Sequence, residues 1–453
     1  MMEHAESRQG TIVQREESDV VAELLQRPAS IEHTGLRAGA LSDLALKTLY
    51  QAGEMTGRKI AEALCLPFRD VVDSVLTFLD RQGFVEVTGS SGFGEQAFRY
   101  AVSQKGTDSA RELLVRSQYV GPAPVPLQQY NRMIQAQGVG RVRIAKEDLH
   151  QAFDGLVMND ATLDKLGPAL NSGRSIFLYG PSGNGKTTVA VAMARMLASE
   201  HIYVPYAAEV SGHIIRIYDP ILHHRISEPK VEEDLADSPF ANWRQSGRQL
   251  DDRWVRIERP LVIVGGELTL GSLDLIYDST SNYYEAPYQM KANGGMLVID
   301  DLGRQQVNPR DLLNRWIGPL ETRLDFLSLH SGAKIEVPFE QFVVFATNLN
   351  PAELVDAAFL RRIRHKILLP DPTPSEFKQV FRSVCERHEI AWDDGAFSHL
   401  MQEWYTKPGR AMRYSHSRDI VDQVLDICKY EGQPAQVTTE LVDRACSSYF
   451  ADL

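Results

Sequence analysis

A glycine-rich segment at residues 180–187 constrains the fold of this 453-residue chain more than any other feature. It reads Gly-Pro-Ser-Gly-Asn-Gly-Lys-Thr, a complete G-x4-G-K-[ST] motif. The apolar run 175–179 before it has the composition of a buried strand, and residues 187–197 after it have that of a helix. In such a unit the glycines let the loop curl so that successive backbone N–H groups face a phosphate. The segment therefore predicts an α/β domain built on a parallel sheet, with a nucleotide bound at this loop.

The loop and the first residues of the following helix supply the expected nucleotide contacts. Lys186 is expected to reach the β- and γ-phosphates, and the Thr187 hydroxyl is expected to ligate Mg²⁺. We therefore predict ATP and Mg²⁺ as cofactors. The predicted contact residues are Gly180, Pro181, Ser182, Gly183, Asn184, Gly185, Lys186, Thr187 and Thr188.

A second segment, residues 294–301, supports the same site. It reads GGMLVIDD, an apolar strand that ends in two carboxylates. In a parallel sheet this strand would lie beside the loop. Asp300 would then hold the Mg²⁺ shell with Thr187, and Asp301 would polarise the attacking water.

The segments that follow resemble those of AAA+ ATPases. Residues 342–350 form another apolar strand, which ends in Thr347-Asn348. The resemblance implies that Asn348 positions the hydrolytic water, the role named sensor 1. It also covers residues 155–157, which are similar to the place where AAA+ domains contact adenine.

Arginines complete the expected AAA+ site. Residues 358–363 are similar to the segment that carries the arginine finger, which implies that Arg361 or Arg362 stabilises charge on the γ-phosphoryl group of a neighbouring subunit. Arg323 is a reserve candidate. Ser417-Arg418-Asp419 resembles the sensor 2 position in the lid, where Arg418 would reach the γ-phosphate. Arg410 and Arg413 are alternatives for that role. The catalytic residues implied are Asp301, Asn348, Arg361, Arg362 and Arg418.

Two features depart from the AAA+ pattern. Asp301 stands where a glutamate is usual, so hydrolysis could be slow or need a partner. The separation of 113 positions between Thr187 and Asp300 also indicates an insertion, at about 211–292. Its position resembles the helix-2 insert of the MoxR, magnesium-chelatase and enhancer-binding branches. Within it, residues 262–275 are expected to form a hairpin, and Tyr283 and Tyr284 either line a pore or are half-buried on a surface hairpin.

The chain divides into five expected regions. A flexible tail (1–36) precedes a winged-helix domain of α+β class (37–118), expected from three helices, a β-hairpin and a closing helix. A linker (119–145) leads to the AAA+ α/β core (146–370), and a helical lid (371–453) follows. The fold class predicted is thus an α/β P-loop AAA+ parallel sheet flanked by helices, with a C-terminal lid and an N-terminal winged helix.

Charge bears on the partners. The chain has a formal net charge of −12, and its winged-helix region holds ten basic and ten acidic residues. A DNA reader normally presents a basic face, so a protein partner is favoured and DNA is the lesser alternative. No run is long enough to span a membrane and no secretory signal begins the sequence, so we expect no membrane insertion and a cytoplasmic location.

The function predicted from these observations is that of a homo-oligomeric, hexameric ATPase ring that remodels or assembles a client protein complex. The winged helix would serve as an adaptor. The alternatives are a DNA-associated regulator that uses ATP as an assembly switch, and a weakly hydrolysing, nucleotide-gated scaffold.

Overall fold

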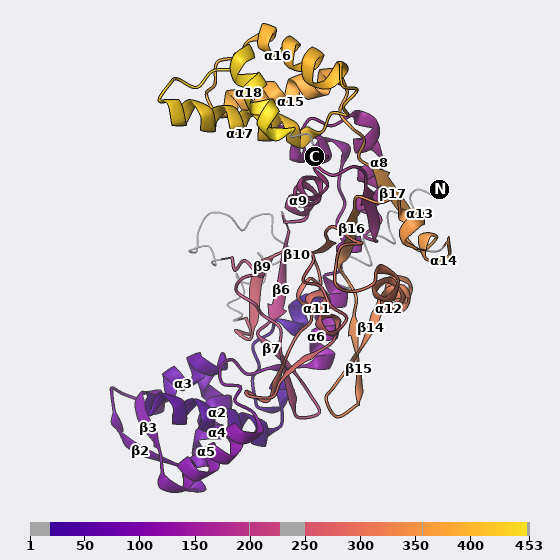
Figure 1. Ribbon diagram of the computed structural model, residues 1–453. Coiled ribbons are helices and arrows are strands. Elements are labelled where there is room, and N and C mark those ends of the chain that lie inside the picture. Colours follow the sequence, from indigo (N-terminus) through magenta and orange to yellow (C-terminus); the bar gives the residue numbers. More distant parts are fainter. Residues whose placement is uncertain (1–18, 199, 227–249, 356, 451–453) are drawn as a thin grey trace.

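The computed structural model describes residues 19–198, 200–226, 250–355 and 357–450. Figure 1 shows an N-terminal domain at one end, a group of C-terminal helices at the other, and an α/β core between them. Across these described ranges, no helix is both long and apolar enough to cross a membrane.

A five-stranded parallel sheet forms the centre of the core. Its strands are rich in Val, Ile, Leu and Phe, as expected for strands buried on both faces. Successive side chains point to opposite faces: Ile176 belongs to one buried cluster and Phe177 to the other. The strand order is β10 (Leu261–Val264), β13 (Met296–Ile299), β16 (Phe342–Thr347), β5 (Ile176–Tyr179) and β17 (His365–Leu368), and every neighbouring pair is parallel.

Helices cover both faces of this sheet. One buried cluster joins the sheet to α7 (Lys146–Ala152), α8 (Asp160–Asn171) and α9 (Lys186–Leu197). The other joins it to α12 (Pro309–Thr322), α13 (Pro351–Leu354) and α14 (Ala357–Leu360), around the fully buried Trp316. The predicted α/β P-loop sheet flanked by helices is therefore confirmed.

The predicted insertion has different limits. Residues 261–264 pair in parallel with β13 as the edge strand of the central sheet, so the expected hairpin at 262–275 is wrong. The extra elements lie on both sides of β10. Before it come β6 (His201–Pro205), β7 (Ala207–Val210), β8 (His213–Arg216) and β9 (Trp254–Glu258), and after it come η5 (Gly271–Leu273), β11 (Ile276–Asp278), β12 (Tyr283–Glu285) and α11 (Tyr288–Lys291).

Four of the inserted strands join β4 (Val125–Pro126) of the linker in a second sheet, of order β11-β12-β8-β7-β4. The other two, β6 and β9, form a separate pair. This sheet buries Tyr284, which is only 1% exposed. The ring of Tyr283 packs edge-on against Tyr119, with 5.8 Å between ring centroids. The pore-lining interpretation is therefore wrong for Tyr284, which is buried rather than half-buried. Tyr283 is half-buried in the antiparallel pair β11–β12, in agreement with the hairpin alternative.

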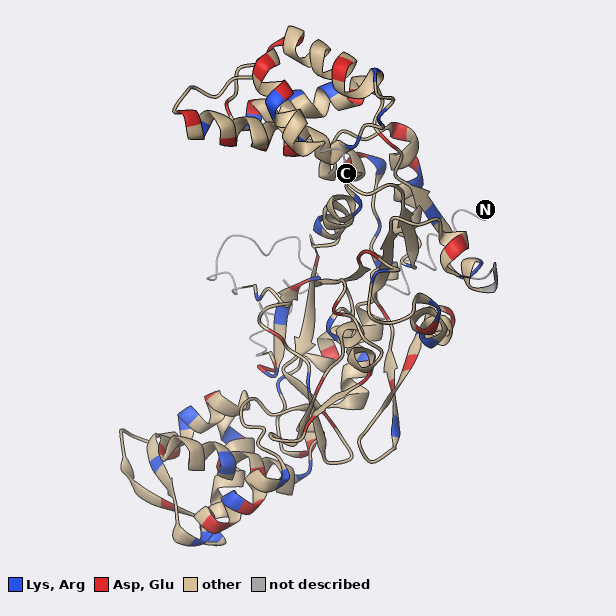
Figure 2. Ribbon diagram, in the orientation of Figure 1, with Lys and Arg blue, Asp and Glu red and all other residues tan. Residues whose placement is uncertain are grey.

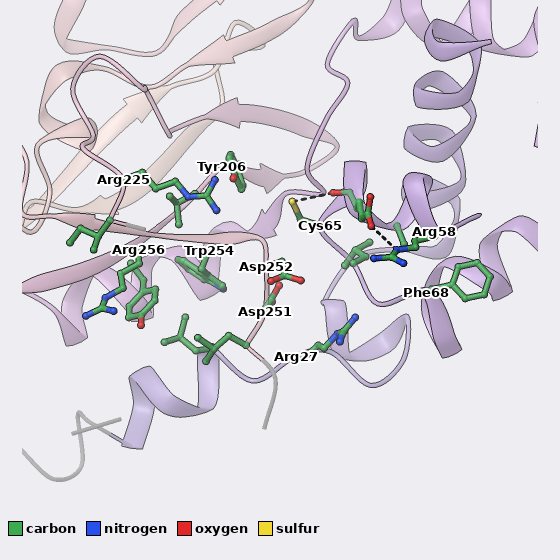
Figure 3. Close-up of a pocket in the computed structure, with 18 of the residues that line it drawn as sticks. Arg27, Arg58, Cys65, Phe68, Tyr206, Arg225, Asp251, Asp252, Trp254 and Arg256 are labelled. Atoms are coloured by element: carbon green, nitrogen blue, oxygen red, sulfur yellow. Dashed lines mark hydrogen bonds and ion pairs between the residues drawn. The ribbon is translucent and has the colours of Figure 1, made fainter. Parts of the chain in front are cut away.

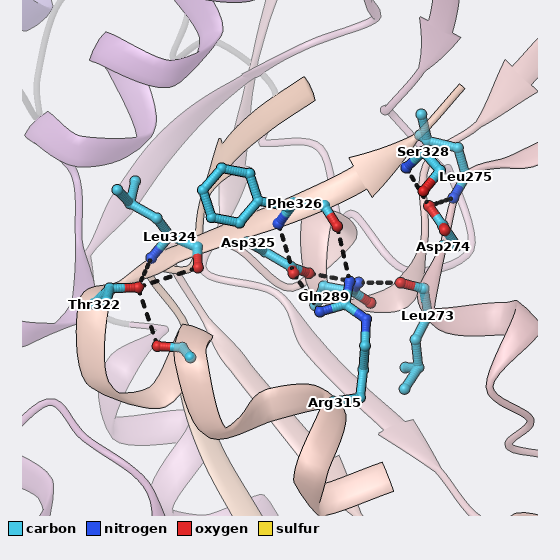
Figure 4. A network of polar contacts seen from close by, with 11 residues as sticks. Leu273, Asp274, Leu275, Gln289, Arg315, Thr322, Leu324, Asp325, Phe326 and Ser328 are labelled. Carbon is cyan, nitrogen blue, oxygen red and sulfur yellow. Dashed lines mark hydrogen bonds and ion pairs between the residues drawn. The ribbon is translucent and has the colours of Figure 1, made fainter. Parts of the chain in front are cut away.

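A β-hairpin that the sequence did not predict follows α12. It consists of β14 (Leu324–Ser328) and β15 (Lys334–Pro338). A buried carboxylate anchors it: Asp325 accepts from Arg315 of α12 at 2.6 Å and from Gln289 of α11 at 3.1 Å (Figure 4). The Ser328 N–H donates to Asp274 at 2.8 Å, which ties the hairpin to the segment after η5.

Part of the predicted tail and linker is packed. Val21, Leu24 and Leu25 share a buried cluster with Tyr130 and Met133, so a flexible tail extending to residue 36 is wrong for this part. Burial of these apolar side chains offsets the conformational entropy that the segment loses on ordering. The linker contains η4 (Val139–Arg141), β4 (Val125–Pro126) and α6 (Leu127–Ala136), and η1 (Glu32–Thr34) precedes the N-terminal domain.

The N-terminal domain has the predicted order of elements. Thr56 caps its second helix by accepting from the Lys59 N–H. The third helix begins at Asp73, after a turn in which Asp70 adopts a φ of 65°. Figure 2 shows basic and acidic residues interspersed over this domain. Its elements are α2 (Ala38–Ala52), β1 (Glu54–Thr56), α3 (Gly57–Leu64), η2 (Phe68–Val72), α4 (Asp73–Arg81), β2 (Val85–Ser90), η3 (Glu95–Ala97), β3 (Phe98–Val102) and α5 (Gln104–Arg116).

The C-terminal helices form the predicted lid, which has its own buried cluster. Thr373 and Glu376 form a capping box at the start of the first helix, with Pro374 in its first turn. The helices are α15 (Pro374–Arg387), α16 (Asp394–Leu400) with the π-helical turn η6 (Met401–Thr406), α17 (Tyr414–Glu431) and α18 (Thr439–Tyr449).

Candidate nucleotide-binding site

A cavity of about 470 Å³ lies where the central strands end and the lid begins. The carboxyl ends of parallel strands meet at one edge of a sheet, and ligands bind there in open α/β folds. β5 leads into the P-loop, β13 ends before Asp300 and β16 ends before Asn348. Residues 182–188, Asp300, Asp301 and Asn348 all line this cavity.

The P-loop has the backbone that its glycines predict. Gly183 and Gly185 have φ values of 83° and 76°, which L-residues rarely adopt, and Gly185 caps α9. Gly180 and Pro181 were predicted to contact nucleotide but do not line the cavity. Their carbonyls instead accept hydrogen bonds from Lys186, at 2.9 and 3.0 Å.

Lys186 is held entirely by protein groups. Besides the two loop carbonyls, its ammonium donates to Oδ1 of Asn348 at 2.5 Å. An ammonium has three donors, so all three are satisfied. Burial lowers the pKa of Lys186, and the charges of Asp301 and Asp300 oppose that shift. A phosphate must therefore exchange with one of these partners rather than meet a free cation.

Thr187 and Asp300 form the candidate Mg²⁺ site. The Thr187 hydroxyl donates to Oδ2 of Asp300 at 2.7 Å, so the two oxygens converge on one point. Mg²⁺ prefers oxygen ligands and usually takes one or two from protein, with the rest from water and phosphate. The pair fits that chemistry. Within the described ranges no group of three or more His, Cys, Asp or Glu side chains offers an all-protein metal cage.

Asn348 links the two charged ends of the site. Its Nδ2 donates to Oδ1 of Asp301 at 3.0 Å while its Oδ1 accepts from Lys186. These two partners fix which end of the amide is oxygen. Asp301 has a φ of 50°, a strained value for a non-glycine residue. The site thus places a carboxylate, an amide and an ammonium in one hydrogen-bonded row.

Gln305 holds the backbone that follows β13, at Asp300 and Gly303, and was not identified from the sequence. Its Nε2 donates to the Asp300 carbonyl at 2.7 Å, and its Oε1 accepts from the Gly303 N–H at 2.9 Å. A polar residue in a loop gives no sequence signal of such a role.

The lid and the segment before α8 close the cavity. Arg418 lines it, as do residues 155–157, in agreement with their expected proximity to nucleotide. The side chain of Arg418 is 68% exposed, and its ion pair is with Asp419 at 3.3 Å. Further lining residues were missed: Asn159, Tyr414, Ser415 and a stripe on α15 consisting of Val380, Ser383, Val384 and Arg387. The spacing of that stripe, one face of a helix, is the signal that could have found it.

The arginine-finger candidates lie outside their own chain's cavity. Arg361 is exposed, whereas Arg362 pairs with Glu321 at 2.6 Å. Arg323 donates to the carbonyls of Phe339, Gln341 and Gly173. These contacts make Arg323 part of the core's packing and remove it as a reserve candidate.

The two alternatives to Arg418, Arg410 and Arg413, form contacts with other residues of the lid and its connection to the core. The guanidinium of Arg410 lies 3.8 Å from the Phe450 ring centroid and donates to the Trp404 carbonyl at 2.7 Å. Arg413 forms an ion pair with Asp371. Neither lines the cavity, so Arg418 is the one of these three candidates that does, beside Arg387 of α15.

A larger cavity of about 790 Å³ lies between the N-terminal domain and the inserted strands (Figure 3). Its charges are mixed: Arg58 pairs with Glu62 at 2.9 Å, and Asp251 pairs with the buried Arg253 at 2.8 Å. Burial, with added repulsion from Asp252 and Asp251, raises the pKa of Cys65 to about 11, so its thiol is not a nucleophile at neutral pH. The described residues that line this cavity form no arrangement comparable to the P-loop site.

The sheet order, the P-loop and the C-terminal helices together define the fold class: an α/β P-loop domain whose parallel sheet is flanked by helices and followed by a helical region. Among solved structures, NtrX from Brucella abortus has a TM-score of 0.37 and 14% identity, covering 67% of this chain and 56% of that chain. The RuvB Holliday junction branch migration motor from Thermotoga maritima has a TM-score of 0.38 and 13% identity, covering 66% of this chain and 73% of that chain.

The similarity to these structures is too low to carry an inference about substrate or partner. This chain spans only 56% of the length of the NtrX structure. In the lid, residues 373–448 match the family described as a domain of unknown function (DUF8689). No curated protein matches the chain. A functional proposal therefore rests on the geometry of the site.

Proposed function

We propose that the protein is an AAA+ ATPase that binds Mg²⁺-ATP between its P-loop and its lid and hydrolyses the γ-phosphate. The observation that carries the proposal is the convergence of Lys186, Thr187, Asp300, Asp301 and Asn348 at one sheet edge, within hydrogen-bonding distance of one another. These residues lie in the segments that follow three strands, β5, β13 and β16, and no single structural role requires all of them in one cavity.

Each group has a distinct task in this reaction. Lys186 and the N–H groups at the start of α9 hold the phosphates. Thr187 and Asp300 would hold Mg²⁺, which neutralises charge on the phosphates when bound. The Asp301 carboxylate accepts a hydrogen bond from the attacking water, and Asn348 keeps that carboxylate in place. Phosphoryl transfer needs mainly positioning and charge stabilisation, which this set supplies.

A second subunit would complete the site. Arg361 and Arg362 are our candidates for an arginine acting on a neighbour's nucleotide, and Arg361 is preferred because Arg362 already pairs with Glu321. This geometry supports a ring, for which we propose a hexamer. We propose that this ring remodels or assembles a client protein complex, as MoxR-like proteins do. Movement of the lid would be transmitted to the client through the inserted strands.

The N-terminal domain would serve as a winged-helix adaptor for a protein. Its balanced charge supports this over DNA binding, because binding to DNA depends on neutralising phosphates with an excess of Lys and Arg. Retention of the protein on a DNA column at low salt, with loss at high salt, would favour the DNA-associated alternative instead.

Binding of a fluorescent ATP analogue tests the nucleotide site. Wild-type protein should bind it in the presence of Mg²⁺, and Lys186→Ala should weaken binding strongly. Lys165→Ala, which removes an exposed lysine of α8, is the matched control and should leave binding unchanged. Equal binding by all three proteins would contradict the proposal. Mass measurement of the nucleotide-bound wild type decides whether a hexamer forms.

A further inference from the structure

The P-loop and the lid are joined by a three-residue link that the proposed reaction does not use directly. Asp371 lies in the short connection between β17 and α15, where the core ends and the lid begins. Its Oδ1 accepts from Nδ2 of Asn184 in the P-loop at 2.8 Å. The same oxygen pairs with the guanidinium of Arg413, which caps α17 in the lid.

A second contact runs in parallel with this link. The Ser415 N–H, in the first turn of α17, donates to the Gly183 carbonyl at 2.9 Å. Gly183 is also close to the lid: a Cβ built on it would lie 2.5 Å from the Ser415 hydroxyl oxygen. The start of α17 is therefore attached to two successive P-loop residues, once directly and once through Asp371.

Neither Asp371 nor Arg413 lines the nucleotide cavity, so neither is placed to touch nucleotide. Asn184 is 4% exposed and belongs to the loop whose N–H groups face the phosphates. Arg418, on the same helix as Ser415, does line the cavity. A shift of α17 relative to the loop would therefore move Arg418 and the loop together.

We propose that Asp371 is a positioning residue that locks the orientation of the lid to the conformation of the P-loop. Through it, the state of the phosphate-binding loop sets the angle at which α17 presents Arg418. The inference rests on the proposed nucleotide site, but its key prediction concerns the protein without nucleotide.

The link can be cut at either end with small changes. Asp371→Asn retains an oxygen that can accept from Asn184 but removes the charge that holds Arg413. Asn184→Ala removes the P-loop end and leaves the ion pair to Arg413 intact. The matched control is Asp394→Asn, which makes the same charge change in a lid ion pair, to Lys378, remote from the P-loop.

Distances between a spin label on the lid and one on the core, measured by double electron–electron resonance, give the decisive readout. Labels at Tyr430→Cys on α17 and Glu147→Cys on α7 use two exposed positions, in a Cys65→Ser background because the other cysteines are buried. Without nucleotide, the distance distribution should be narrow in wild type and Asp394→Asn, and broader in both Asp371→Asn and Asn184→Ala. Affinity for a fluorescent ADP analogue should fall about five- to tenfold in the two link variants, the size expected for the net contribution of one hydrogen bond.

Unchanged distances in both link variants would overturn the proposal. Broadening in Asp371→Asn but not in Asn184→Ala would also overturn it, because Asp371 would then fix the lid without reference to the P-loop. If wild type failed to bind nucleotide at all, the proposed function would fail, while the nucleotide-free distances would still decide the role of Asp371.

Discussion

Replacing Asn348 with alanine should separate catalysis from nucleotide binding. In the structure, Asn348 accepts from Lys186 at 2.5 Å and donates to Asp301 at 3.0 Å. The substitution removes both contacts and leaves the phosphate-binding groups in place. Asp301, already at a strained φ of 50°, loses the amide that fixes its carboxylate toward the proposed water.

The size of the effect follows from these contacts. Removing one preorganised polar group from a reacting centre costs about 10²–10³ in kcat, or roughly 3–4 kcal/mol of transition-state stabilisation. Lys186 loses a partner that competes with phosphate, so nucleotide affinity should change by less than about threefold, within about 0.7 kcal/mol.

Steady-state ATP hydrolysis and binding of a fluorescent ATP analogue would measure the two quantities separately. Asn350→Ala is the matched control, because Asn350 caps α13 two residues further on and does not line the cavity. The control should lose only about 1 kcal/mol of stability and keep its kcat. A kcat for Asn348→Ala within threefold of wild type would refute the assignment of Asn348 to the reaction.

Three further predictions concern other groups. Arg361→Ala should abolish hydrolysis by the assembled protein while leaving nucleotide affinity intact. Mixing Arg361→Ala subunits with Lys186→Ala subunits, which supply the arginine, should restore hydrolysis. No recovery of hydrolysis would count against a role of Arg361 between subunits. Asp301→Glu should raise kcat by at least about threefold if the shorter carboxylate limits activation of water, and an unchanged or lower rate would remove the weakly hydrolysing scaffold alternative. Burial, reinforced by Arg413, lowers the pKa of His416 to about 4, so the folded state binds fewer protons than the unfolded state between about pH 4 and 6.5. The free energy of unfolding should therefore rise with pH across that window, by about 1–2 kcal/mol after allowance for partial exposure of the ring, and His416→Gln should flatten this rise in chemical denaturation.

The nucleotide site was largely predictable because its signals are local. The P-loop is one contiguous segment, and the spacing of its glycines and lysine identifies their roles. The apolar strand before it and the helix after it support that interpretation. The lid helices were predictable for the same reason: the Thr373–Glu376 capping box marks a helix start within four residues.

The errors arose where the structure depends on distant partners. The four residues of β10 resemble one arm of a hairpin because turn residues follow them directly in the sequence. Their parallel partner β13 begins 35 positions after the start of β10. Likewise, Gln305 and Asp371 are ordinary polar loop residues until the fold brings their partners to them. The packing of Val21 and Leu25 against the linker helix is equally long-range.

The central claim is that this site hydrolyses ATP, and a single-turnover assay of γ-phosphate release tests it most directly. With enzyme in excess over Mg²⁺-ATP, wild type should release phosphate, and Lys186→Ala and Asp300→Ala should not, whereas Lys165→Ala should match wild type. Release at equal rates from wild type and Lys186→Ala, or none from wild type at a protein concentration that saturates ATP binding, would contradict the account.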